Sequence, residues 1–456
     1  MNCIFCCVFN QEQYVDMFLL LLESIFIYGN LGYNTKVLIY TSTPFKKRIQ
    51  QSHLFDSNTI QFEINDTYNT IDKACKARLD LFQLSSIANY QKVLYLDTDL
   101  LIKDDINKVF DVCKDDILYA LEEGDPGIIS SDIGEYWGKT LFGNELDKYN
   151  DKSPFTSGIL LFNNCIKIKD LFQKINEDMV NRPYYFSFYD QPYIVYNAFK
   201  YNLYDNQILK KLAVNNDDNI HSNKVIYHFP GGDGIYQHKI VKMNMFLNQM
   251  KDKSINENIN NTKAYINANL LPIIYNCGEL LEGNIFMYHH TTRYTDMFLN
   301  KAKNISNMVL NKNIKNVMEI GFNSGFSALL MLLSNPNICV SCFDLGEHTY
   351  TLPCYNKLKE TFGDRINITL GDSTKTLPTK NNKYDLIHID GGHSTEVAES
   401  DIVNSYRLSK QGTILIMDDY DFPNLHILWD SYIIKYNLKC LDISIYESPH
   451  HNIKYV

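Results

Sequence analysis

The segment Val93-Leu94-Tyr95-Leu96-Asp97-Thr98-Asp99 joins a short apolar run to two carboxylates separated by one residue. An uninterrupted apolar run of this length predicts a buried strand. Open α/β sheets bind ligands at the carboxyl ends of their strands, so Asp97 and Asp99 are expected at a ligand-binding edge. Two carboxylates there can hold a divalent cation that neutralises a diphosphate. A solvated strand end is the alternative interpretation, because Asp-x-Asp alone is a weak signal.

The segments around this strand alternate between strand and helix patterns. Apolar runs at Cys3–Phe9, Thr35–Tyr40 and Lys92–Leu96 are separated by helix patterns near Val15–Tyr28 and Thr70–Asn89. This alternation predicts a parallel sheet in a doubly wound α/β domain.

A second series of strands follows in the last third of the chain. Five strands with helix patterns between them are predicted at Val317–Ile320, Cys339–Phe343, Ile366–Leu370, Leu386–Ile389 and Thr413–Met417. A closing hairpin is predicted from Lys439–Tyr446 and Asn452–Val456.

A polar, Asn-rich stretch over Asn248–Asn269 separates the two series and predicts a surface helix plus a linker. We therefore expect one α/β domain at residues 1–250, a linker at 251–270, and a second α/β domain at 271–456. A chain of 456 residues is also too long for one ordinary core.

The bulk composition excludes several classes of protein. A net charge of −10 argues against a dedicated nucleic-acid binder. The 11 cysteines are scattered, and no CxxC pair offers a convincing zinc site, which favours a reducing compartment. The sequence shows neither a signal peptide nor an apolar stretch long enough to span a bilayer, so a cytoplasmic location is expected.

Three further motifs follow the Asp-x-Asp strand: Phe155–Asn163 (FTSGILLFN), Asp190-Gln191-Pro192, and His228-Phe229-Pro230-Gly231-Gly232. Together with Asp97-Thr98-Asp99 they stand in the order of glycosyltransferase family 8, which residues 1–245 resemble. The resemblance implies a GT-A-type fold and retaining transfer of a hexose from a nucleotide sugar. UDP-linked hexoses are the donors that fit this family best.

The resemblance also assigns roles to residues of this chain. Asp97, Asp99 and His228 would bind Mn²⁺. Asp190 and Gln191 would lie beside the donor sugar. The alternatives are that Asp190 only caps a helix and that His228 is a satisfied buried histidine.

Three basic residues are implied at the donor. Lys76 and Arg78 precede the Asp-x-Asp strand where the family places a basic residue, and Lys239 follows the His motif where the family has a diphosphate-binding lysine. The spacing after Gly231 is longer than in the family, so the roles of Lys239 and His238 depart from its pattern. The Ser157-Gly158 pair and Asn163 would belong to the acceptor-side strand.

In the second half, Glu319-Ile320-Gly321 continues through Gly325 into a helix pattern. Glycines let a ligand approach the backbone closely, and a dinucleotide enzyme could use such a loop as well. The Glu-x-Gly-x-x-x-Gly pattern resembles motif I of class I S-adenosylmethionine-dependent methyltransferases, over residues 270–456.

The methyltransferase resemblance implies further cofactor-binding residues. Glu319, Gly321 and Gly325 would form the binding loop, and Asp344 would accept hydrogen bonds from the ribose. Asp372 and Ser373 would contact the adenine.

Asp390 ends the fourth strand of this half, and Asp418-Asp419 end the fifth. This arrangement resembles catechol-type and macrocin-type O-methyltransferases, which implies Mg²⁺ bound by the three carboxylates. His393 would be the base or complete the metal shell. The alternative is that Asp418-Asp419 only cap the following segment, which leaves His393 as the base without a metal.

The combined interpretation is a bifunctional enzyme that transfers a sugar to a glycan or glycoconjugate acceptor and methylates a sugar hydroxyl. Two alternatives remain open. One domain could be inactive and bind a glycan or nucleotide, or the methyltransferase could act on an unrelated small molecule or protein.

Overall fold

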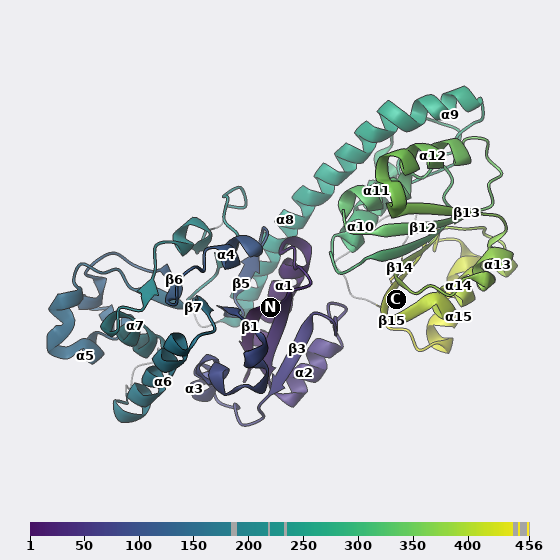
Figure 1. Cartoon of the computed structure of the whole chain (residues 1–456). Helices are drawn as coiled ribbons and strands as arrows, with labels where there is room; N and C mark the ends of the chain where they lie inside the picture. The colour runs from purple at the N-terminus through teal and green to yellow at the C-terminus, as the bar shows by residue number, and fades with distance from the viewer. Residues whose placement is uncertain (184–188, 218, 232–234, 441–445, 447–453, 456) are drawn as a thin grey trace. The chain divides into compact units, whose positions relative to one another are not determined.

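The computed structural model describes residues 1–183, 189–217, 219–231, 235–440, 446 and 454–455. The chain forms two compact units, Met1–Met250 and Lys251–Val456 (Figure 1). Each unit contains its own sheet with helices on both faces, so the prediction of two α/β domains is confirmed.

The first unit is built on a seven-stranded sheet of order β3-β2-β1-β4-β7-β6-β8. The strands β3, β2, β1 and β4 are parallel, and β7 runs antiparallel to both β4 and β6. The strand bounds are β1 (Asn2–Val8), β2 (Thr35–Thr41), β3 (Ile60–Ile64), β4 (Lys92–Leu96), β6 (Leu118–Glu122), β7 (Phe155–Asn163) and β8 (Tyr204–Asp205).

Alternate residues of these strands enter two cores, as expected for a sheet buried on both faces. Cys3 and Phe5 of β1 join one core, which includes residues of α6 (Ile166–Asn181) and α7 (Gln191–Lys200). Ile4 and Cys6 join the other, which includes α1 (Glu12–Tyr28), α2 (Thr43–Gln50) and α4 (Asn107–Asp111).

A second, three-stranded sheet in this unit has the order β5-β10-β9. It contains β5 (Leu100–Ile102), β9 (Ala213–Asn215) and β10 (Ile226–His228), with β10 antiparallel to β5 and parallel to β9.

The prediction of a single helix over Thr70–Asn89 is wrong in detail. The segment is a short helix, α3 (Ile71–Ala74), followed by 3₁₀ turns at Ala77–Gln83 and Ser85–Asn89. Arg78 lies in the first of these turns and is buried, with its Nε 2.8 Å from Asp190 Oδ2.

The expected linker, residues 251–270, is helical. It contains the end of α8 (Tyr236–Tyr265) and a π-helical turn (Ile266–Leu270), and α9 (Leu271–Cys277) follows. Ile255, Ile259 and Ile266 are buried at roughly helical spacing. The polar composition of this stretch therefore belongs to the exposed face of a helix.

The second unit has a six-stranded sheet of order β13-β12-β11-β14-β15-β16, parallel except for the last strand. Its strands are β11 (Asn316–Ile320), β12 (Cys339–Asp344), β13 (Ile366–Leu370), β14 (Tyr384–Ile389), β15 (Ser409–Met417) and β16 (Lys454–Tyr455). The five predicted strands are confirmed. Most of the predicted closing hairpin lies outside the described residues, apart from β16, which pairs with β15.

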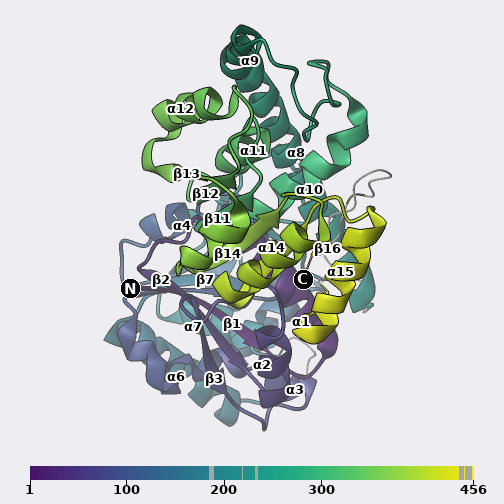
Figure 2. The same ribbon diagram turned by 90° about the vertical axis from the view of Figure 1, so that its right-hand side faces the viewer.

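Helices cover both faces of this second sheet, as Figure 2 shows. The helices α10 (Leu299–Val309), α11 (Phe326–Ser334) and α12 (Thr351–Phe362) lie on one side. The helices α13 (Ser373–Thr376), α14 (Thr395–Leu408) and α15 (Pro423–Lys435) lie on the other, where α14 and α15 share a core with β11, β14 and β15.

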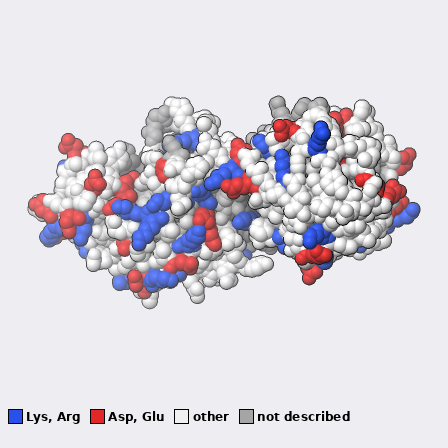
Figure 3. Space-filling model, turned by 90° about the horizontal axis from the view of Figure 1, so that it is seen from above, with Lys and Arg blue, Asp and Glu red and all other residues white. Residues whose placement is uncertain are grey.

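Acidic and basic side chains are intermixed on the surface drawn in Figure 3. None of the described helices combines the length and the apolar character that crossing a bilayer requires.

Candidate active sites

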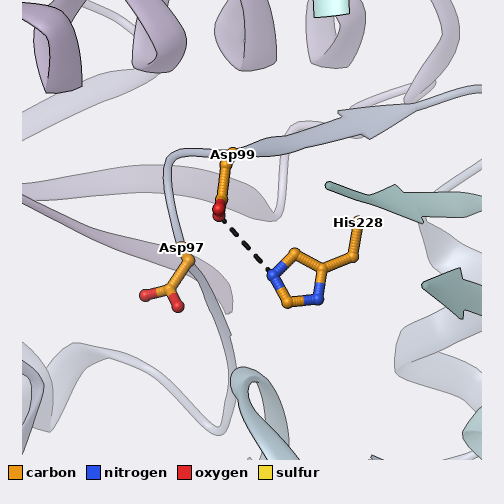
Figure 4. Close-up of side chains that lie close together, drawn as sticks. All are labelled: Asp97, Asp99 and His228. Atoms are coloured by element: carbon orange, nitrogen blue, oxygen red, sulfur yellow. Dashed lines mark ion pairs between the residues drawn. The ribbon is translucent and has the colours of Figure 1, made fainter. Parts of the chain in front are cut away.

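The first candidate site lies where β4 ends and the small sheet begins. Asp97 directly follows β4, and Asp99 directly precedes β5. The β5–β10 pairing places His228 opposite Leu100, and the Phe229 N–H donates to the Asp99 carbonyl at 3.0 Å. Strand pairing therefore brings His228 beside the two carboxylates (Figure 4).

The three side chains have the geometry of a metal-binding group. One ligand atom of each lies within 4.8 Å of the others, and His228 Nε2 is 3.5 Å from Asp99 Oδ1. On the far side of the ring, His228 Nδ1 is 2.8 Å from Asn215 Oδ1. When Nδ1–H donates to this oxygen, Nε2 presents a lone pair toward the carboxylates. Two carboxylates and a neutral imidazole nitrogen fit Mn²⁺.

Lys239 belongs to the same cluster. Its Nζ is 2.7 Å from Asp99 Oδ2. Burial would raise the pKa of Asp99, but His228 and Lys239 together hold that pKa below its ordinary value. Asp99 is therefore an anion, and the nearby ammonium adds the positive charge that a diphosphate requires.

Arg78 is the second cation in this region, and it is buried. Its Nε lies 2.8 Å from Asp190 Oδ2, and its NH1 lies 3.4 Å from Asp97 Oδ1. Its guanidinium carbon also stands 4.7 Å from the centre of the Tyr95 ring. Burial raises the pKa of Asp190 to about 6, although Arg78 opposes the shift. Arg78 thus connects the first carboxylate of the Asp-x-Asp motif to Asp190.

Two further residues, Gln191 and Gly158, lie next to these side chains, because Gln191 binds Ser157 and Gly158 faces His228 and Asp97. Gln191 Oε1 accepts hydrogen bonds from the Ser157 N–H at 2.9 Å and the Ser157 hydroxyl at 3.1 Å. A Cβ on Gly158 would lie 2.8 Å from His228 Cε1 and 3.0 Å from Asp97 Oδ2. Gly158, expected on the acceptor side, therefore leaves space for the metal-binding group itself.

Lys76, expected at the donor, and Asn163, expected on the acceptor-side strand, have other partners in the structure. Lys76 is 43% exposed, and its Nζ is 3.9 Å from Asp72. Asn163 pairs with Lys92 at the opposite end of β7 from Gly158, and its amide donates to the Asp115 carbonyl. Asn163 lies in β7 with Ser157 and Gly158, as predicted, but at the other end of the strand, so the acceptor role of Asn163 stays a prediction. Asn215, in contrast, is a site residue that the sequence analysis missed.

The second candidate site lies at the carboxyl edge of the second sheet. Gly321 has φ 92°, and a Cβ there would lie 1.8 Å from the Asp390 carbonyl oxygen. Gly325 has φ 77°, and a Cβ there would lie 2.5 Å from the Phe322 ring. Both positions therefore require glycine, as the motif predicts.

The loop between these glycines carries polar groups that fit a bound cofactor. Asp344 Oδ2 accepts the N–H groups of Phe322 at 2.8 Å and Asn323 at 2.7 Å. Asn323 Oδ1 and Ser324 Oγ are buried and have no hydrogen-bond partner within the described residues. Unsatisfied polar atoms next to a glycine loop are those that S-adenosylmethionine could satisfy.

The predicted adenine contacts are placed beside each other after β13, but Asp372 is engaged locally. Its Oδ1 accepts the Thr374 N–H at 2.9 Å, and its Oδ2 is 3.0 Å from Lys375 Nζ. The hydrogen bonds from Thr374, followed by that from Lys375, lower the pKa of Asp372 to about 2. Asp372 is the N-cap of α13.

Asp390 after β14 and Asp418 after β15 have ligand atoms within 4.8 Å of each other and of His388, and Asp419 lines the same pocket. His393 Nε2 is 2.8 Å from Asp419 Oδ2. Burial, followed by the charge of Asp418, raises the pKa of Asp390 to about 7. Burial and the neighbouring negative charge disfavour the ionised form of Asp390, and a divalent cation such as Mg²⁺ would stabilise that form.

A buried network of charges supports this edge, and the sequence analysis missed it. Lys301 Nζ lies 2.5 Å from Asp418 Oδ2. His388 bridges Asp418 Oδ2 and Glu319 Oε1 at 3.3 Å each. Burial lowers the pKa of His388, but hydrogen bonds to Asp418 and Glu319 raise it to about 10.

This network changes the expected role of two residues. Asp418 is committed to an internal cation, and a metal ion would have to compete with Lys301 for it. Glu319, expected at the cofactor, is fully buried and faces His388. The signals in the sequence were a lysine on the apolar face of a helix and a histidine inside an apolar strand.

Comparisons with known proteins bear on both units. Residues 318–420 match a family described as a methyltransferase domain. No curated protein sequence matches this chain.

Three solved structures are similar to parts of the chain. The apo structure of WbbM, a bifunctional glycosyltransferase, is 18% identical with a TM-score of 0.38, over 54% of this chain and 51% of that one. Mouse xyloside xylosyltransferase 1 is 12% identical with a TM-score of 0.38, over 51% of this chain and 98% of that one. CalS11, a TDP-rhamnose 3′-O-methyltransferase, is 16% identical with a TM-score of 0.29, over 35% of this chain and 78% of that one.

The match to WbbM spans about half the length of that protein. The family match confirms the resemblance predicted for the second unit: residues 318–420 of this chain form a methyltransferase domain, and the chain is a transferase.

Proposed function

We propose that the chain is a bifunctional enzyme of glycan modification. The first unit transfers a hexose from a nucleotide sugar, UDP-linked, to a glycan or glycoconjugate. The second unit methylates a sugar hydroxyl with S-adenosylmethionine. The observation that carries the first activity is the convergence of Asp97, Asp99 and His228, with the His228 ring oriented by Asn215.

In the first unit, Asp97, Asp99 and His228 would hold Mn²⁺, which supplies positive charge to the departing nucleoside diphosphate. Lys239, held by Asp99, adds an ammonium on the same side. Arg78 fixes Asp190, and Ser157 fixes Gln191, so both side chains are positioned before a donor binds. Such preorganisation lowers the cost of orienting the sugar.

In the second unit, S-adenosylmethionine supplies an electrophilic methyl group. The loop from Gly321 to Gly325 would approach it with backbone alone. The carboxylates of Asp390 and Asp419 would hold Mg²⁺. His393 would remove the proton of the acceptor hydroxyl, and its hydrogen bond to Asp419 raises its pKa and orients its ring.

The glycosyltransferase proposal is tested by release of nucleoside diphosphate from a panel of nucleotide sugars with Mn²⁺. We expect one donor to turn over in the wild type, and Asp99→Ala to abolish its turnover. Asp111→Ala, an exposed aspartate of α4, is the matched control and should behave as wild type. Equal turnover by wild type and Asp99→Ala would contradict the proposal.

A further inference from the structure

Two tyrosines connect the first helix of the first unit to the start of α8. The hydroxyl of Tyr14, in the first turn of α1, donates to the hydroxyl of Tyr236, the first residue of α8, at 2.9 Å. Their rings also meet edge to face, with centroids 5.2 Å apart. Burial, followed by the hydrogen bond to Tyr236, raises the pKa of Tyr14, so its hydroxyl stays protonated. The two residues are 222 positions apart, so the fold and not local structure brings them together.

Apolar packing holds the same part of α8 against the strands that carry the metal-binding group. Met17 of α1, Leu101 of β5 and Met243 of α8 belong to one buried cluster, and the two tyrosines pack at its edge. The strand β5 begins directly after Asp99, and β10 ends at His228. The start of α8 is therefore attached to the small sheet at the site.

Lys239 lies one turn after Tyr236. Residues three apart share a face of a helix, so the tyrosine pair fixes the backbone on the face that carries Lys239. Its side chain is 15% exposed, and its Nζ is 2.7 Å from Asp99 Oδ2. The other oxygen of that carboxylate, Oδ1, is 3.5 Å from His228 Nε2. The ammonium therefore lies beside the metal-binding group without taking the oxygen that faces the histidine.

Two attachments hold Lys239 in this place, and they respond differently to a bound metal. The ion pair with Asp99 weakens once that carboxylate shares its charge with a metal ion. A lysine side chain is long and flexible, so an ammonium on an unfixed backbone loses more rotamer freedom when it binds a phosphate. The contact between Tyr14 and Tyr236 does not involve Asp99, so it persists when the ion pair weakens.

We propose that the hydrogen bond between Tyr14 and Tyr236 positions Lys239 to bind the diphosphate of the nucleotide-sugar donor. Both tyrosines act through Lys239, so they are positioning residues and need not touch the donor phosphates. The inference rests on the proposed function of the first unit, and it makes selection of a diphosphate over a monophosphate depend on the start of α8. An ammonium that is held in place beforehand reduces the entropy lost on binding.

The test measures binding of UDP and of UMP, each with Mn²⁺, to the full-length chain by calorimetry. Lys239→Ala should weaken UDP binding by about 10-fold or more and UMP binding by less than about twofold, because UMP lacks the second phosphate. Tyr14→Phe and Tyr236→Phe should each weaken UDP binding by about 3- to 10-fold and leave UMP binding within about twofold. The double variant with both tyrosines changed should lose no more than either single variant, since each removes the same hydrogen bond.

Tyr90→Phe is the matched control. Its hydroxyl donates to Gln61, and Tyr90 precedes β4, at the opposite end of that strand from Asp97. This variant also loses one hydrogen bond between a tyrosine and another side chain, but it should bind both nucleotides as wild type does.

Coupling to Lys239 separates positioning from a general structural role. In a Lys239→Ala background, Tyr236→Phe should change UDP binding by less than about twofold. Equal weakening of UDP binding by Tyr236→Phe in both backgrounds, or equal weakening of UDP and UMP binding, would overturn the inference and leave the proposed function intact. So would a Lys239→Ala variant that loses no more affinity for UDP than for UMP, a result that stands even where a tyrosine variant fails to fold. Failure of wild type to bind UDP would overturn the proposed UDP-hexose transfer and this inference together.

Discussion

At the scale of single residues, the first site depends on an amide that does not touch the proposed metal. Asn215 Oδ1 holds His228 Nδ1 and so directs Nε2 toward Asp99. Partners of this kind typically change metal affinity by about 10–100-fold.

We therefore expect Asn215→Leu to weaken Mn²⁺ binding by about 10–100-fold, measured by electron paramagnetic resonance titration. Asn215→Asp keeps an acceptor for Nδ1–H and should retain most of the affinity. Equal loss in both variants would mean that Asn215 acts through packing and not through the histidine.

Gly158 leaves the space in which these side chains meet. Gly158→Ala would place a methyl group 2.8 Å from His228 Cε1, where real Cβ contacts do not occur. We expect Mn²⁺ affinity to fall by about 10-fold or more, because the histidine must move away from the carboxylates. Gly32→Ala is the matched control, since a Cβ there meets nothing within 4 Å. Unchanged Mn²⁺ binding in Gly158→Ala would contradict the assigned metal geometry.

Asp401 of α14 should make the stability of the second unit depend on pH. Burial raises its pKa from 3.8 to about 6 in the folded chain, so its carboxyl ionises first in the unfolded chain. Relative to Asp401→Asn, the free energy of unfolding of wild type should therefore fall by roughly 3 kcal/mol as pH rises from about 3 to about 7.

Urea unfolding in a Trp137→Phe background can measure this effect, because Trp429 is then the single tryptophan and reports on the second unit. A difference between wild type and Asp401→Asn that does not change with pH would contradict the raised pKa.

At the scale of helices and strands, the sequence predicts the long elements well and their pairing poorly. Apolar runs such as Lys92–Leu96 identify buried strands, because burial on both faces requires them. The three-residue strands β5 and β10 leave no comparable pattern. Their pairing brings His228 to Asp99, which only the motif order could suggest.

The buried charges of the second unit show a similar limit. Lys301 of α10 and Asp418 after β15 are far apart in the sequence, and neither position alone predicts an ion pair. The glycine loop and the strand-end acids, in contrast, are local patterns, and the structure places them at one edge of the sheet.

The Lys301–Asp418 pair connects α10 to the end of β15, so its loss should affect the folding of the second unit. Lys301→Met leaves Asp418 buried without its lysine and should cost about 3–5 kcal/mol in the free energy of unfolding. The double variant Lys301→Met with Asp418→Asn removes both charges and should recover a large part of that loss. A double variant no more stable than Lys301→Met would show that the pair does not account for the effect. The Trp429 signal in the Trp137→Phe background measures both variants.

At the scale of the whole molecule, two separate α/β patterns in the sequence correspond to two compact units. Each unit has its own sheet and its own cluster of candidate site residues. The candidate metal-binding groups, Asp97–Asp99–His228 and the carboxylates around Asp390, lie in different units. Residues without a motif, such as Asn215 and Tyr236, became visible only when the fold brought distant segments together.

The central claim is that one chain carries two transferase activities that depend on separate sites. The most direct measurement assays nucleoside diphosphate release and S-adenosylhomocysteine formation in parallel for wild type, Asp99→Ala and Asp390→Asn, with a nucleotide-sugar panel and a glycoside acceptor. We predict both products from wild type, only S-adenosylhomocysteine from Asp99→Ala, and only nucleoside diphosphate from Asp390→Asn. Loss of both products in either variant would contradict the account. Retention of both products in both variants would contradict it as well.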